Sequence, residues 1–186
     1  DDGDLDALVA NDGQPNKVWL NTGGSFTDSG QNLGTAASQG LAFGDIDRDG
    51  DLDVFVAING GANIVWLNTN GSFSTNQTLG NSASMGVALG DIDQDGDLDA
   101  FVINDNQADE VWRNEDGIFS LVQSLGSSSS REVVLGDLDH DSDLDAIVVN
   151  ENQENVVWQN DGSGVFFDSG LSMGNSSGSD VALADL

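Results

Sequence analysis

The chain has neither cysteine nor tyrosine, and its 186 residues include one proline and four basic side chains. Without cysteine it has no disulfide and no thiolate metal ligand. The basic residues face 33 acidic ones, a formal net charge of −29, which argues against binding to nucleic acid or to an anionic membrane surface. No apolar run approaches bilayer-spanning length, so we expect no membrane insertion. A folded chain this acidic needs counter-charge, and metal cations can supply it.

The aromatic residues that are present reveal an internal repeat. The phrases "KVWLN", "IVWLN", "EVWRN" and "VVWQN" recur with their tryptophans 47, 46 and 46 residues apart. A Gly/Asn-containing turn, a Phe and then "LG" or "MG" follow each phrase. Such a period indicates a repeat architecture. The tryptophans are Trp19, Trp66, Trp112 and Trp158.

Within one unit the hydrophobic pattern has a period of two, which is typical of strands. From Gly40 onward, "GLAFGDI", "VFVAI", "IVWLN" and "SFSTNQTL" alternate with turns, so we expect four antiparallel strands in each unit. The predicted fold is an all-β propeller of four repeated four-stranded blades. A β-helix has shorter repeats, and a β-sandwich would not repeat so closely. The units are residues 1–44 with 185–186, 45–90, 91–136 and 137–184 of a single domain.

Three of the four units carry a complete acidic loop with the pattern D-x-D-x-D-G-D-L-D, in which Ser142 replaces the glycine once. Alternating carboxylates on a tight loop suit Ca²⁺, which takes six to eight oxygen ligands, and the glycine permits the sharp turn. We expect about one structural Ca²⁺ per repeat, with side-chain oxygens from loop positions one, three, five and nine and the carbonyl of position seven. The predicted ligands are Asp45, Asp47, Asp49, Asp51 and Asp53; Asp91, Asp93, Asp95, Asp97 and Asp99; and Asp137, Asp139, Asp141, Asp143 and Asp145.

The loop differs from an EF-hand. Position twelve is Val56, Val102 or Val148 rather than a bidentate Glu, and strands flank the loop. Mg²⁺ is disfavoured by its octahedral demand, and zinc or copper by the ligand type. The alternative is a solvated Asp-rich turn without an ion. Ser142 predicts a weaker third site, because serine adopts a left-handed conformation less readily than glycine.

The motif "GDIDQDGDLDAFV", followed by V-W-x-N, "NGSF" and "LG", resembles FG-GAP/VCBS-type propeller repeats, which are similar to the calcium-bearing blades of integrin α-subunits. The resemblance covers essentially the whole chain. It implies that the loop joins the innermost strand of a blade to the next strand out, with a structural ion. It also implies an extracellular or cell-surface protein, often bacterial, with an unidentified protein or glycan partner. The Gly-Ala-Pro part of the motif is absent and the repeats are shorter than integrin blades, so integrin-like ligand binding does not follow.

The two ends of the chain match two parts of one further loop. Asp2, Asp4 and Asp6 align with positions five, seven and nine, and Asp185 aligns with position one. We therefore expect strand sharing between the termini, which would leave no open sheet edge. The ring could close in one chain or in two, head-to-tail joining would give a filament, or the segment could be an excerpt of a longer array.

No catalytic set repeats along the chain, and the lone His140 occupies a variable loop position. We therefore predict a non-catalytic interaction, adhesion or assembly module. The tryptophans have two interpretations. Packed between blades they are core, whereas exposed at a rim they could stack on sugars, which would make the protein a lectin.

Overall fold

The computed structural model describes residues 3–185, which form strands and turns with no helix among them. The strands build one three-stranded and three four-stranded antiparallel sheets, each of which we call a blade. Blade 1 contains β1 (Ala7–Val9), β2 (Lys17–Thr22) and β3 (Ser25–Asn32). Blade 2 contains β4 (Ser38–Gly44), β5 (Asp53–Ile58), β6 (Asn63–Thr69) and β7 (Ser72–Leu79). Blade 3 contains β8 (Ser84–Gly90), β9 (Asp99–Asn104), β10 (Asp109–Glu115) and β11 (Ile118–Leu125). Blade 4 contains β12 (Ser130–Gly136), β13 (Asp145–Asn150), β14 (Gln153–Asn160) and β15 (Phe166–Ser176).

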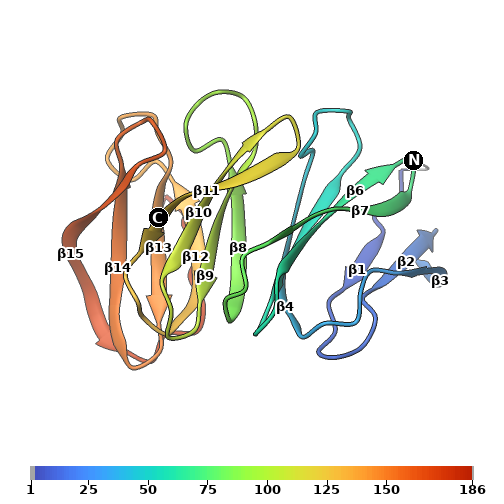
Figure 1. Cartoon of the computed structure of the whole chain (residues 1–186), viewed down its shortest axis with the longest axis horizontal. Helices are drawn as coiled ribbons and strands as arrows, with labels where there is room; N and C mark the ends of the chain where they lie inside the picture. The colour runs from blue at the N-terminus through green and yellow to red at the C-terminus, as the bar shows by residue number, and fades with distance from the viewer. Residues whose placement is uncertain (1–2, 186) are drawn as a thin grey trace.

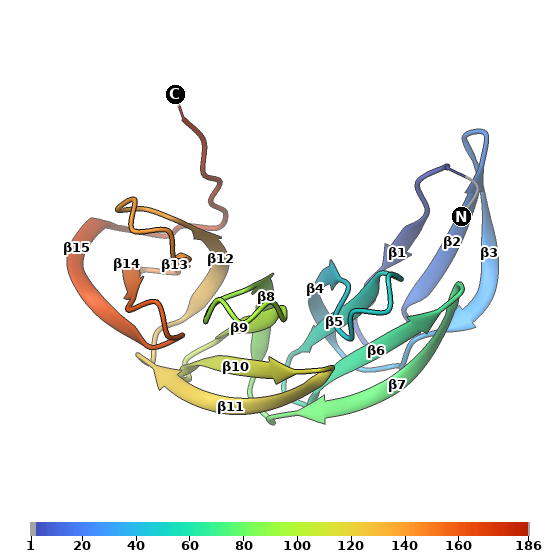
Figure 2. The same cartoon turned by 90° about the horizontal axis from the view of Figure 1, so that it is seen from above.

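The blades stand side by side with their strands roughly parallel to one axis (Figure 1). Each four-stranded blade follows chain order from its first strand to its last. Seen from above, the first strands β4, β8 and β12 line the inside of a curve, and β3, β7, β11 and β15 form its outer rim (Figure 2). The predicted all-β fold of repeated antiparallel sheets is confirmed for blades 2 to 4.

The predicted closure into a ring is not seen, because the blades form an open arc whose arms carry the two ends of the chain (Figure 2). Blade 1 has three strands, and residues 177–185 lie outside every described strand. This segment nevertheless packs as a further inner strand would. Leu183 lies against Gly136 as Leu135 lies against Gly90.

The core lies between neighbouring blades. The second strands β5, β9 and β13 are buried along their whole length. Aromatic pairs join one blade to the next in edge-to-face geometry. Phe55 meets Phe119 with ring centroids 5.6 Å apart, and Phe101 meets Phe166 at 5.2 Å.

The inner strands approach too closely for side chains at one point. A Cβ added at Gly40 on β4 would lie 2.9 Å from the Cα of Gly86 on β8. Glycine is therefore required there because backbone packs on backbone, and this contact sets the narrow spacing on the inside of the arc.

On the outer rim, a glutamine joins each blade to the next. Gln77 on β7 accepts a hydrogen bond from the Phe119 N–H (2.9 Å) and donates one to the Phe119 carbonyl (2.8 Å). Gln123 makes the same pair of bonds with Phe166, and Gln31 bonds to Gly71 and to the Phe73 N–H. Each glutamine thus acts like a short extra strand between two sheets that have no ladder hydrogen bonds to one another.

The fourth repeat carries Leu171 at the position of these glutamines. Replacing a glutamine by leucine therefore tests whether its hydrogen bonds clamp neighbouring blades together. We expect Gln77→Leu to destabilise the fold by about 1–3 kcal/mol, because two buried backbone groups lose their partners. The Phe119 amide should exchange with deuterium faster, while the Phe166 amide, held by Gln123, serves as the internal control. Equal protection of Phe119 in both proteins would contradict a clamping role.

Candidate metal centre

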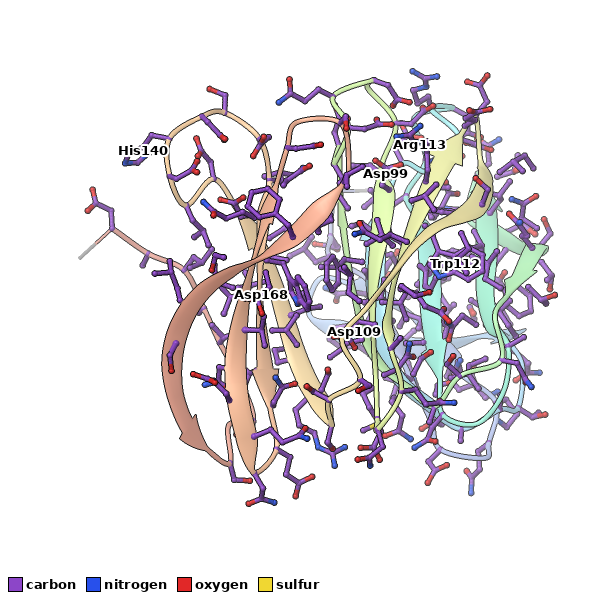
Figure 3. The ribbon with its side chains drawn as sticks, turned by 60° about the vertical axis from the view of Figure 1, so that its left-hand side comes forward. Asp99, Asp109, Trp112, Arg113, His140 and Asp168 are labelled. Atoms are coloured by element: carbon purple, nitrogen blue, oxygen red, sulfur yellow. The ribbon has the colours of Figure 1, made fainter. Side chains whose placement is uncertain are left out.

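The acidic loops lie together at one end of the strands, where each connects the first strand of a blade to the second. Figure 3 shows Asp99, Arg113 and His140 at this end, with Asp109 farther along the strands. This connection is the one that the family resemblance implied. The loops are residues 45–53 (first loop), 91–99 (second loop) and 137–145 (third loop).

The chain brings three carboxylates of each loop into one cluster. Within each cluster, one oxygen from every residue lies within 4.8 Å of the others. In the first two loops these are positions one, three and nine, and in the third they are positions one, three and five. The clusters are Asp45, Asp47 and Asp53; Asp91, Asp93 and Asp99; and Asp137, Asp139 and Asp141.

Several oxygens in these clusters suit a hard cation. Asp45 Oδ1, Asp91 Oδ1 and Asp93 Oδ1 are buried and have no hydrogen-bond donor. A buried carboxylate oxygen without a donor is costly, and Ca²⁺ is a partner that takes such oxygens. The residues therefore fit a calcium ion at the first and second loops.

The pKa values of the ninth-position carboxylates reflect their burial. Burial raises the pKa of Asp99 to about 6, against hydrogen bonds from the Asn114 and Ile92 N–H groups and with a further upward contribution from Asp93. Burial likewise raises the pKa of Asp53. A cation bound at either cluster would oppose this shift by stabilising the ionised form.

The ninth position also closes the loop. Asp53 accepts hydrogen bonds from the Ile46 and Asn68 N–H groups, both at 2.8 Å. Asp99 and Asp145 accept the equivalent bonds at 2.8–3.1 Å. Position nine therefore ties the start of the loop to the third strand of the blade, a role that the sequence did not reveal.

The seventh position uses its side chain in hydrogen bonds to a neighbouring turn, and the ligand role of its carbonyl stays a prediction. Asp51 Oδ2 accepts the Asn70 N–H at 2.6 Å, and Asp97 Oδ2 accepts the Asp116 N–H at 3.2 Å. These donors belong to the turns that follow β6 and β10. The fifth-position residues Asp49 and Asp95 lie outside the first two clusters.

The sixth position has a left-handed backbone in all three loops, with φ of 96° at Gly50, 95° at Gly96 and 78° at Ser142. The N–H of this residue donates to the first-position carboxylate in each loop, at 3.1–3.3 Å. Ser142 thus keeps the same path at a cost in backbone strain. The weaker affinity expected for the third loop stays a prediction.

The fourth loop, predicted to form from both ends of the chain, is not assembled. Asp4 Oδ2 accepts the Gly23 N–H at 2.7 Å, and Asp6 Oδ1 accepts the Asn21 N–H at 2.8 Å. These are the bonds that positions seven and nine make in the other loops. The C-terminal end of the chain lies on the opposite arm of the arc (Figure 2), and Asp2 lies outside the described residues.

The tryptophans pack at the contacts between blades. Trp112 is 8% exposed and belongs to the cluster between blades 2 and 3, and Trp66 and Trp158 pack against the clusters on either side. Trp19 is half-buried. The Trp66 ring lies against Gly34 of the preceding repeat, so this glycine leaves room for the indole. This geometry favours the core interpretation over a sugar-stacking rim.

Two structural features of charged residues were not predicted from the sequence. Arg48 and Arg113 reach into the second loop, forming ion pairs with Asp97 and Asp93. Asp109 is a buried acid at a position where the other repeats carry Asn. In the sequence, the arginines and Asp109 are visible as differences from the residues at the same positions of the other repeats. These differences do not show which residues the side chains contact.

The comparison with protein families agrees with the motif. The family model described as FG-GAP-like repeat matches three times, over residues 1–56, 45–102 and 91–148. Each match from one acidic loop to the next spans one structural unit. No curated protein gives a significant match.

Proposed function

Because the chain belongs to the FG-GAP-like repeat family, we propose that it is a non-catalytic extracellular module whose acidic loops bind structural Ca²⁺. The observation that carries the proposal is the set of buried carboxylate oxygens without donors in loops of ordered geometry. FG-GAP repeats are typical of extracellular proteins, where calcium is abundant enough for sites of modest affinity. The described residues include no helix that could cross a membrane.

The role of the ion follows from what the loop joins. The first-position carboxylate directly follows the inner strand, and the ninth-position carboxylate begins the fully buried second strand. A bound Ca²⁺ would supply positive charge between them and hold the two strands together. Asp53, Asp99 and Asp145 would hold the loop in place through the backbone, whichever cation is present.

Calorimetric titration tests the proposal directly. We expect about three Ca²⁺ per chain, one for each loop between residues 45 and 145, because each gathers three carboxylates. Mg²⁺ should bind much more weakly, since it requires octahedral geometry and keeps its waters. A chain that binds no Ca²⁺ at millimolar concentration, or that binds Mg²⁺ equally well, would contradict the proposal.

Assembly through strand pairing is the second candidate function. β1 pairs with β2 on one side only, and the segment 177–185 belongs to no described strand, although its Gly178 N–H donates to the Asn150 carbonyl (3.2 Å) and Leu183 lies in an inner-strand position. Pairing of this segment with β1, within one chain or between two, would cover an exposed sheet edge. Mass measurement in solution with calcium separates monomer, dimer and polymer. The packing of Trp112 between blades gives no support to a lectin.

A further inference from the structure

Positive charge is unevenly distributed over the three acidic loops. The chain has four Lys and Arg residues, and two of them converge on the second loop. Arg113 Nε lies 2.6 Å from Asp93 Oδ2, and Arg48 Nε lies 2.7 Å from Asp97 Oδ1. Lys17 pairs with Asp28, and Arg131 pairs with Glu151 at the other end of the strands. Arg48 is itself a residue of the first loop, but among the described residues no ion pair joins a Lys or Arg to a carboxylate of the first or third loop.

The contact made by Arg113 is the more important one, because Asp93 belongs to a candidate cation cluster. Asp93 is 9% exposed, and its other oxygen, Oδ1, is buried without a donor. A guanidinium group thus already occupies one oxygen of the third-position carboxylate. Figure 3 shows Arg113 and Asp99, the ninth position of the same loop, at the same end of the strands.

Arg113 also contacts blade 4, through a guanidinium nitrogen other than the one that pairs with Asp93. Its Nη2 donates to the Ser163 carbonyl at 2.9 Å, in the turn between β14 and β15 of blade 4. In the same turn, Gly164 lies against Asp93, and a Cβ there would meet the Asp93 Cβ at 3.2 Å. The guanidinium group therefore joins the second loop of blade 3 to blade 4 and is held in position from two directions.

The other repeats carry neutral residues at the position of Arg113. These are Leu20, Leu67 and Gln159. Gln159 shows what a neutral residue does there, since its Nε2 donates to Asp139 Oδ2, the third position of its own loop, at 2.9 Å. The geometry of the contact is thus shared between blades 3 and 4, whereas only the second loop has an arginine at this position.

We infer that Arg113 is a built-in counter-ion that lowers the calcium affinity of the second loop relative to the first and links its occupancy to the contact between blades 3 and 4. The inference rests on the proposed function. A bound Ca²⁺ and the guanidinium group would share the Asp93 carboxylate and repel one another. Because Arg113 is 36% exposed, solvent reduces this repulsion, and we expect an effect of about tenfold in affinity.

Site-resolved titration by NMR tests the inference. The sixth-position amides of Gly50 and Gly96 donate to the first-position carboxylates of the first and second loops, so each reports its own site. In the wild type, the Gly96 amide should respond at about tenfold higher Ca²⁺ than the Gly50 amide. In Arg113→Leu, which copies Leu67, the Gly96 midpoint should fall by about tenfold with the Gly50 midpoint unchanged.

The reciprocal variant is the matched control. Leu67→Arg places the same charge beside the first loop and should raise the Gly50 midpoint while leaving Gly96 unchanged. A Gly96 midpoint that is unchanged or raised in Arg113→Leu overturns the inference even though calcium binds. If neither amide responds to Ca²⁺ in the wild type, the proposed function itself fails.

Discussion

Removing calcium is expected to destabilise this protein by about 8 kcal/mol relative to the calcium-saturated state. A ligand present at about 100 times its Kd stabilises the folded state by about 2.7 kcal/mol per site, and three loops each gather a carboxylate cluster. Without the ion, buried oxygens such as Asp45 Oδ1 and Asp91 Oδ1 have no partner. Urea unfolding with excess EDTA and at saturating calcium measures the difference.

A substitution that disables one loop should remove the part of the calcium-dependent stabilisation that this loop contributes. Asp91→Asn takes the charge from a buried first-position oxygen of the second loop, so the calcium-dependent stabilisation should fall by about 2–3 kcal/mol. Asp168→Asn removes the same charge from an exposed position on β15 (Figure 3) and leaves the loops intact. Equal stability with and without calcium, or equal effects of the two variants, would refute a structural ion.

Asp109→Asn should stabilise the protein, and by more as the pH rises. Asp109 is 3% exposed on β10, where it accepts hydrogen bonds from the Asn104 N–H (2.8 Å) and from Ser130 Oγ of the next blade (3.0 Å). Burial raises its pKa to about 7, against these two hydrogen bonds and with a smaller upward contribution from Glu110. The other repeats place Asn16, Asn63 and Asn155 in the same backbone contact.

The direction of the pH dependence follows from this raised pKa. The folded state keeps the Asp109 proton up to about pH 7, whereas the unfolded chain releases it near pH 3.8, so wild-type stability falls between these values and stays low above them. One pKa unit corresponds to about 1.36 kcal/mol. The advantage of Asp109→Asn should therefore grow by about 2 kcal/mol between pH 5.5 and 8.5, measured by urea unfolding at fixed free calcium.

The reverse substitution gives the control. Asn63 is fully buried and bonds to the Ile58 N–H as Asp109 bonds to Asn104. Asn63→Asp should introduce into blade 2 the pH-dependent loss that Asp109→Asn removes from blade 3. If the stability difference between Asp109→Asn and the wild type is the same at both pH values, the buried ionisation is not the cause.

The regular features of the molecule could be read from short stretches of sequence. The continuous apolar run "VFVAI" predicted a strand, observed as the buried β5, and the spacing of aspartates predicted loops with converging carboxylates. These predictions succeeded because strand periodicity and tight-turn geometry depend on neighbouring residues. The fourth loop was predicted by alignment alone, and alignment does not show whether Asp4 and Asp185 meet.

The contacts between blades could not be predicted in this way. Arg48 Nη2 reaches Asp116 across 68 residues, as Asn114 Nδ2 reaches the Ile46 carbonyl. Such partners depend on how two sheets are placed against one another, which the pattern within each repeat does not encode. Asp109 illustrates the same limit, since its substitution for Asn was visible but its burial against Ser130 was not.

By itself, then, the sequence determined the repeat, its strands and the acidic loops, because each arises from local periodicity and turn chemistry. Only the tertiary structure decided that the blades form an open arc, that the tryptophans pack between them and that two arginines converge on the second loop. The physical reason is that these features depend on how the blades are packed. Packing alone determines which carboxylates are buried beside a guanidinium group and which are left for a cation.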